Sequence, residues 1–144
     1  MGNEQQIMKL ERFRILWAKE RRNALAKSLK LCVTYAKARH FYIDRTGELT
    51  RNIKARGPYL KGKERMYGEV VAEKHYAEYV EEGTRPHRID SAILIADIGW
   101  LFIGMHPGSR KHRFLSRSIL ANEAKIGQEF NKAFRNAKQR AGLH

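Results

Sequence analysis

The sequence predicts an α+β fold: a long N-terminal helix and a C-terminal helix packed on a small antiparallel β-sheet with a β-hairpin. Two long stretches that carry apolar residues every three or four positions predict the helices. Between them, two short apolar runs joined by a Gly-containing turn predict the hairpin. The 144 residues fit one domain, residues 1–144, which is long enough to bury a core without disulfide bonds.

Positive charge dominates the composition. Lys and Arg number 29 against 15 Asp and Glu, which gives a formal net charge of +14. Such a chain binds polyanions whatever its role, because neutralised phosphates release counterions. The charge fits solvated helix faces as well as it fits contact with DNA or with acidic surfaces of partner proteins.

A single cysteine and the absence of long apolar runs indicate the environment of the chain. Cys32 lies in an apolar helical pattern, which predicts an inert buried thiol and fits a reducing cytoplasm. The first residues lack the apolar core of a secretory signal. The longest apolar run, 92–105, is interrupted by Asp97 and is too short to cross a bilayer. We therefore expect a soluble protein without membrane contact.

Residues 1–40 are predicted to form the N-terminal helix, from Glu4 to Arg39. This stretch holds ten Lys or Arg against three Glu, so most of its charge is unpaired along the helix. A basic helix can lie on nucleic acid or on a membrane surface. Core packing is the favoured interpretation, because the aromatic residues belong to the apolar stripe, which comprises Leu10, Phe13, Trp17, Ala24, Leu25, Leu29, Cys32, Val33 and Ala36.

Residues 41–66 are predicted to form a short helix and a mobile basic loop. Asp44 and Thr46 are suitable caps for a helix with Leu49 and Ile53 on one face. The segment Arg56–Arg65 then combines glycine, proline and lysine without periodicity, which is typical of a mobile loop.

Residues 67–105 are predicted to form the sheet. Tyr76–Glu82 fits a helix or a strand equally well, and Gly83 after it is a position where positive φ is expected. The hairpin strands are Ile93–Ala96 and Trp100–Ile103, joined by a turn at Asp97–Gly99. Both strands are apolar on both faces, so we expect the second face to be covered partly by a helix and partly by a neighbouring subunit.

Residues 113–141 are predicted to form the C-terminal helix, continuous from about Phe114 to Ala141. Its last turns are basic, which favours the negative end of the helix dipole. One face is apolar at helical spacing and comprises Leu115, Ile119, Ile126, Phe130, Phe134, Ala137 and Ala141.

The residues that carry chemistry do not form a recognisable active site. The sequence contains neither a phosphate-binding loop nor a dinucleotide-binding glycine motif. Its six His are scattered, so we expect no metal and no cofactor. Glu78, Glu81 and Glu82 lie close in sequence to His75 and His87, which is the basis for an alternative as a small metal-dependent hydrolase. Because nothing places an acid–base pair, we expect no enzymatic activity and no catalytic residues.

Two basic clusters flank the predicted hairpin at its base. They are Arg85-Pro86-His87-Arg88 and Ser109-Arg110-Lys111-His112-Arg113, each bounded by Gly or Pro. They are either solvated loops or an electropositive rim for phosphates or for carboxylates of a partner. Aromatic residues interleave little with these charges in sequence, which disfavours a platform for stacking bases.

Several short motifs, taken in order, resemble the tail-component family of tailed bacteriophages, which includes tail-completion and head–tail joining proteins of the neck. The resemblance spans roughly residues 40 to 120. Departures include Glu82, where the family has an apolar or aromatic residue, and Arg113 and Ser118, where it has proline. The matching motifs are Thr46-Gly47-Glu48-Leu49, Tyr76-Ala77-Glu78-Tyr79-Val80-Glu81-Glu82-Gly83-Thr84-Arg85-Pro86-His87, His106-Pro107-Gly108-Ser109 and Arg113-Phe114-Leu115.

The resemblance implies a non-enzymatic structural protein of the virion, assembled in the host cytoplasm. It implies a homo-oligomeric ring, commonly hexameric, that contacts other neck and tail-tube proteins. From the positive charge we also expect weak, non-specific contact with packaged DNA. The alternative is a basic nucleic-acid-binding module that contacts phage DNA. Our candidate interface residues are Glu78, Glu81, Glu82, Arg85, His87, Arg88, Ile93, Ile95, Trp100, Phe102, Arg110, Lys111 and Arg113.

Overall fold

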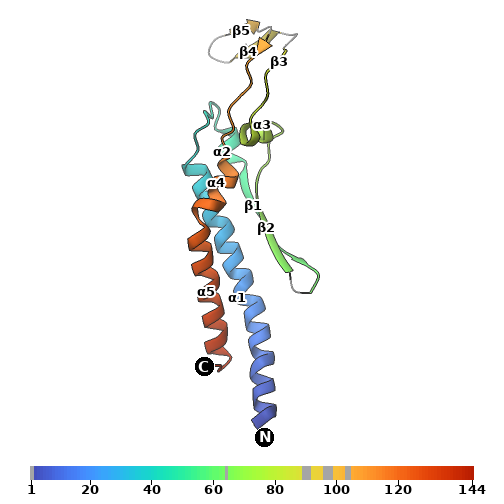
Figure 1. Cartoon of the computed structure of the whole chain (residues 1–144), viewed down its shortest axis with the longest axis vertical. Coiled ribbons are helices and arrows are strands. Elements are labelled where there is room, and N and C mark those ends of the chain that lie inside the picture. Colours follow the sequence, from blue (N-terminus) through green and yellow to red (C-terminus); the bar gives the residue numbers. More distant parts are fainter. Residues whose placement is uncertain (1, 64, 89–91, 96–98, 103–104) are drawn as a thin grey trace.

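A computed structural model describes residues 2–63, 65–88, 92–95, 99–102 and 105–144. Helices α1 (Gly2–Ala38) and α5 (Glu123–Arg140) form an antiparallel pair, so both termini lie at the same end of an elongated molecule (Figure 1). Strands β1 (Ile53–Lys61) and β2 (Arg65–Ala72) form a hairpin beside α1. The remaining short elements lie toward the opposite end, which confirms the predicted α+β class.

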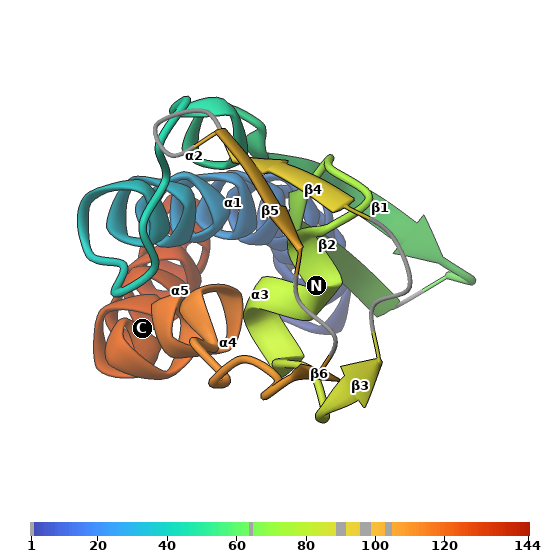
Figure 2. The ribbon, with the colours of Figure 1, turned by 90° about the horizontal axis from the view of Figure 1, so that it is seen from above.

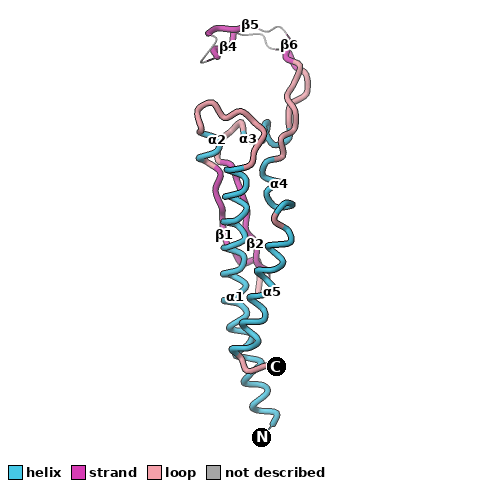
Figure 3. Tube along the Cα trace, turned by 90° about the vertical axis from the view of Figure 1, so that its left-hand side faces the viewer, coloured by secondary structure: helices cyan, strands magenta, loops and turns pink. Residues whose placement is uncertain are grey.

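The contact between α1 and α5 is built from small and aromatic side chains. Buried alanines from both helices allow the backbones to approach closely, and Cys32 is buried as predicted. Phe134 of α5 lies edge-on to Phe13 and Trp17, with ring centroids 5.5 and 5.4 Å apart. The predicted N-terminal helix is therefore confirmed, with its ends within two residues of Glu4 and Arg39. Leu10 of the predicted stripe is nevertheless exposed. The N-terminal end of α1 extends beyond the end of α5 (Figure 3).

The segment Ile53–Ala72 differs from its prediction. The short helix α2 (Glu48–Arg51) ends before Ile53. Residues 56–61 of the predicted mobile loop lie in β1, and Arg65 is the first residue of β2. The register shifts between Arg56 and Tyr59, where Gly57 has a φ of 102°. Most of the strand is exposed and lacks alternating burial, so the period that would reveal a strand is absent.

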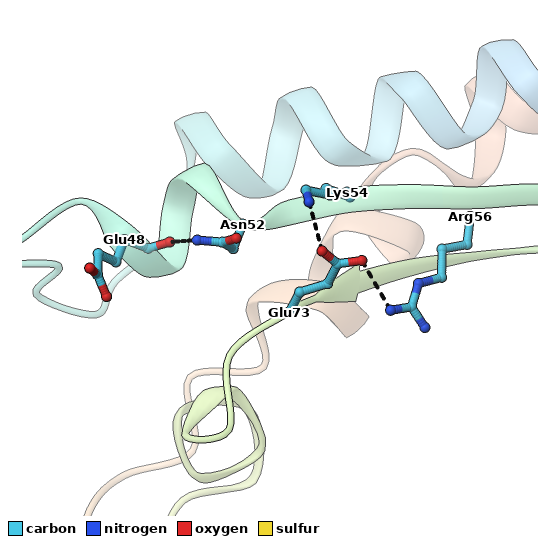
Figure 4. A network of polar contacts seen from close by, with 5 residues as sticks. All are labelled: Glu48, Asn52, Lys54, Arg56 and Glu73. Atoms are coloured by element: carbon cyan, nitrogen blue, oxygen red, sulfur yellow. Dashed lines mark hydrogen bonds and ion pairs between the residues drawn. The ribbon is translucent and has the colours of Figure 1, made fainter.

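Ion pairs with Glu73 offset part of the positive charge of this exposed hairpin. Glu73, just after β2, accepts hydrogen bonds from Lys54 at 2.7 Å and from Arg56 at 3.0 Å (Figure 4). Those two side chains lower the pKa of the Glu73 carboxyl. Beside them, the side-chain amide of Asn52 donates to the carbonyl of Glu48 at 2.7 Å and ends α2.

The predicted sheet of residues 67–105 consists of three separate two-stranded ladders. Besides β1–β2, these are β3 (His87–Arg88) with β6 (Met105–His106), and β4 (Ala92–Ile95) with β5 (Gly99–Phe102). The predicted apolar hairpin is confirmed by the pairing of β4 and β5. It stands at the end of the molecule away from α1 and α5 (Figures 1 and 3). Gly99, predicted to lie in the turn, is instead the first residue of β5 and pairs with Ile95. The burial of the hairpin side chains lies outside the described part of the chain, as do residues 96–98 and 103.

The C-terminal helix is broken, whereas the sequence predicted one continuous helix. Helix α4 (Phe114–Ala121) ends at Asn122, whose φ of −107° and ψ of 6° leave the helical region. The buried Asn122 side chain donates to the carbonyl of Ser118 at 2.7 Å, and α5 starts at Glu123. This local hydrogen bond offers the backbone an alternative to the continued helix.

The core lies where these elements meet. Its buried members are Ala36, Tyr42, Leu49, Ile53, Ala77 and Phe114. The aromatic ring of Tyr42, from the loop after α1, lies 4.9 Å from that of Phe114 at the start of α4. Burial raises the pKa of the Tyr42 hydroxyl, which shares a 3.1 Å hydrogen bond with Thr50.

Candidate partner-binding surface

The two basic clusters lie side by side, as their sequence positions around the hairpin predicted. Thr84 and Ser109 exchange backbone hydrogen bonds of 3.2 and 3.1 Å. Beyond them, His87 pairs with His106 and Arg88 with Met105 in the β3–β6 ladder. The bridge and the ladder together hold Arg85–Arg88 beside Ser109–Arg113.

Two glycines allow this close approach. Gly83 has a φ of 73°, and a Cβ atom there would lie 2.6 Å from the carbonyl oxygen of Ser109. Gly108 has a φ of 86°, and its Cβ would lie 2.3 Å from the carbonyl oxygen of Thr84. The positive φ predicted for Gly83 is therefore confirmed, and the ambiguous segment before it is helix α3 (Ala77–Glu82).

Glu81 connects α3 to α4. Its carboxylate accepts hydrogen bonds from the amides of Leu115 and Ser116, both at 2.9 Å, and from the Ser116 hydroxyl. Residue Arg113 at the N-cap of α4 is left-handed, with a φ of 48°, and makes no side-chain capping bond. Glu81 therefore satisfies the free amides of α4 from another helix, a role that its position in the sequence did not reveal.

The other predicted acidic residues are placed differently. Glu82 lies 3.7 Å from Lys111 of its own chain, and because both side chains are largely exposed this ion pair is weak. Glu78 is exposed on α3. Contact of these carboxylates with basic loops of a neighbouring subunit stays a prediction, which now concerns Glu78 above all. Arg85, His87, Arg88, Arg110 and Arg113 are exposed; for Ile93, Ile95, Trp100 and Phe102 only the strand positions are described.

The structure adds two residues that the sequence did not single out. Phe41 follows α1, and Arg117 lies in α4, yet the Arg117 guanidinium lies 5.1 Å from the centre of the Phe41 ring. Together with Arg110, Lys111 and His112, they line an open pocket of about 440 Å³. Nothing in the local sequence pattern joins Phe41 to residues some 70 positions later; the packing of Tyr42 on Phe114 does so.

Metal ligands do not gather in the part of the chain that the structure describes. The described residues contain no group of three or more His, Cys, Asp or Glu placed to hold a metal ion. None of the described helices combines the length and the hydropathy that crossing a bilayer requires.

These features define an elongated α+β protein. Its basic clusters are exposed beside the β3–β6 ladder, at the end of the molecule opposite the two termini. The model of a family described as "Bacteriophage HK97-gp10, putative tail-component" matches residues 4–83, more than half of the chain. The chain therefore belongs to this family of bacteriophage tail components, which confirms the resemblance noted above. No curated protein and no solved structure matched the chain. Membership indicates a structural component of the virion tail.

Proposed function

We propose that this tail component forms a homo-oligomeric ring in the phage neck, where it completes the tail and joins it to the head. The observation that carries the proposal is that two of the elements beside α1, the β1–β2 hairpin and α4, each carry exposed apolar side chains. Figure 2 shows these two elements at different positions around α1. The hairpin patch consists of Tyr59, Leu60 and Tyr67 on β1 and β2. The helix patch consists of Ile119 and Leu120 on α4.

Two different patches on one subunit support a head-to-tail contact. In such a heterologous contact, one patch of each subunit binds the other patch of its neighbour, and rotation closes the ring. An elongated subunit with its two patches on different elements beside α1 fits this arrangement, because neighbours then pack side by side. The two ends of the rod are left for the adjoining rings.

The end that carries β4, β5 and the basic clusters is our candidate for those contacts. Ile93, Ile95, Trp100 and Phe102 lie on its strands, and Arg85, His87, Arg88, Arg110 and Arg113 lie on the loops below them. Glu78 of a neighbouring subunit is the proposed partner of the basic loops. A structural ring of this kind needs no catalytic residue and no cofactor.

Paired variants test the head-to-tail contact. Leu60→Asp places a charge in the hairpin patch, and Leu120→Asp places a charge in the helix patch. Each charge prevents its patch from binding, so neither variant alone forms rings. An equimolar mixture forms dimers of twice 16.8 kDa, because each variant keeps the patch that the other lacks. Native mass spectrometry reads the masses. Ile43→Asp, a change at an exposed residue outside both patches, is the control and keeps wild-type assembly.

Two results would contradict the proposal. Rings formed by either variant alone would place the subunit contact elsewhere. Images of phage tails that show the protein along the tube or on fibres, instead of as a ring at the head-proximal end, would refute the neck location.

A further inference from the structure

The pocket lined by Phe41, Arg110, Lys111, His112 and Arg117 combines cations with an exposed aromatic ring. We propose that it binds a strand of nucleic acid with unpaired bases, in which the cations hold a phosphate and Phe41 stacks on a base. This site goes beyond the ring proposed above and does not depend on it.

The pocket exists because the core brings two distant segments together. Tyr42 and Phe114 are both buried, and their rings meet edge-on. Phe41, which precedes Tyr42, and Arg117, one turn after Phe114, therefore lie next to each other at the surface. His112, whose ring also lies edge-on to Tyr42 at 6.3 Å, is a further residue that lines the pocket.

The charge at this site is available to a ligand. Arg110, Lys111 and Arg117 are all exposed. Of the nearby carboxylates, Glu81 is held by the amides of α4, and Glu82 lies 3.7 Å from Lys111 in a solvated pair. Guanidinium groups match the geometry of phosphate oxygens and bind them with two parallel hydrogen bonds.

The aromatic residue decides between the two kinds of anion that cations attract. Phe41 is 75% exposed even though the Arg117 guanidinium lies 5.1 Å from its ring centre, so most of the side chain is open to a ligand. A carboxylate of an acidic protein would use the cations but would leave this ring without a role. A nucleic-acid strand uses both, because each base presents a flat face for stacking next to its phosphate. The base must be unpaired, since duplex DNA keeps its base faces inside the stack.

Binding of a labelled oligothymidylate of about 12 nucleotides, a usual site size for single strands, tests the proposal by fluorescence anisotropy on the whole chain. Phe41→Ala is expected to weaken binding about fivefold or more, whereas Phe41→Tyr keeps it. Binding to a duplex of equal length stays within about twofold in both variants, since stacking is not available there. Because Phe41 is exposed, these variants fold as the wild type does, which circular dichroism checks.

A charge-matched pair of double variants separates the pocket from the general positive charge. Arg110→Gln with Lys111→Gln removes two phosphate contacts, so the slope of log affinity against log salt falls by about 1.4, at about 0.7 per contact. Lys132→Gln with Arg135→Gln removes the same charge from exposed positions of α5 and leaves the slope unchanged.

Three outcomes would overturn the proposal. The first is that Phe41→Ala binds single strands as tightly as the wild type. The second is that the α5 double variant weakens binding as much as the pocket double variant does. In the third, polyglutamate displaces the oligonucleotide with equal potency per charge, which would identify a carboxylate site. Ring formation is read by native mass spectrometry without DNA, so this result is independent of the proposed assembly.

Discussion

Gly83 occupies a position where a side chain would meet both backbone strain and a neighbouring carbonyl. Its φ is 73°, and the 2.6 Å that would separate a Cβ atom from the carbonyl oxygen of Ser109 leave no space. We expect Gly83→Val to destabilise the fold by about 1–3 kcal/mol. Urea unfolding measures this change.

Gly127 provides the matched control for that experiment. It lies in α5, and a Cβ there meets nothing within 4 Å. Gly127→Ala should therefore stabilise the protein by about 0.4–1 kcal/mol, because alanine reduces the entropy of the unfolded chain. Equal unfolding midpoints for Gly83→Val and the wild type would show that the turn tolerates a side chain.

Asp44 gives the loop after α1 a defined dependence on pH. Desolvation raises the pKa of its carboxyl, but hydrogen bonds from the Thr50 side chain and from the amides of Thr50, Leu49 and Gly47 outweigh it and lower the pKa below the ordinary 3.8. A lowered pKa in the folded state stabilises the fold above the unfolded-state pKa, and the contribution is lost as pH falls through the folded-state pKa.

Comparison with Asp44→Asn isolates this carboxyl from the others. The wild type should be more stable than the variant above pH 3.8, and the difference should shrink as the pH falls below that value. Urea unfolding at a series of pH values follows the difference. A difference that stays constant down to about pH 2 would mean that the Asp44 charge is not what holds the loop.

Among the elements, α4 depends on a residue that it does not contain. Glu81 of α3 supplies the capping bonds that Arg113 does not provide. We expect Glu81→Ala to cost about 1–2 kcal/mol of stability. Glu78→Ala, one turn earlier on α3 and exposed, should change stability by less than about 0.5 kcal/mol. Equal effects of the two substitutions, measured by thermal unfolding, would remove the capping role.

Elements with a strong internal period were predictable from the sequence, whereas others depended on contacts made elsewhere. The apolar spacing of α1 and the paired apolar runs of β4 and β5 identified them. Strand β1 was missed because its exposed residues carry no alternation, and its pairing with β2 replaces that signal. The break at Asn122 was missed because a buried side-chain hydrogen bond, and not a proline or glycine, ends the helix.

The same distinction applies to the candidate site. The basic clusters and the turn at Gly83 could be read from neighbouring residues. The meeting of Phe41 with Arg117 could not, since it follows from the burial of Tyr42 against Phe114 across some 70 residues of sequence.

At the scale of the whole molecule, assembly should change hydrogen exchange at one end most. The β4–β5 hairpin stands away from the helix pair, so its amides should gain protection when the neck assembles (Figure 3). The β1–β2 hairpin is paired and also packs on α1, so its amides should be protected in both states. Equal protection of β4 and β5 in the isolated and assembled protein would place the contact elsewhere.

The lone cysteine makes the molecule convenient for spectroscopy. Cys32 is 2% exposed between the helices, and burial raises the pKa of its thiol, so little reactive thiolate is present at neutral pH. A maleimide probe should therefore not react with Cys32 and should modify only cysteines introduced on the surface. One spin label on Gly127→Cys and another on Ile43→Cys would report distances within a subunit, and single labels would report the spacing between subunits. No background substitution is needed first.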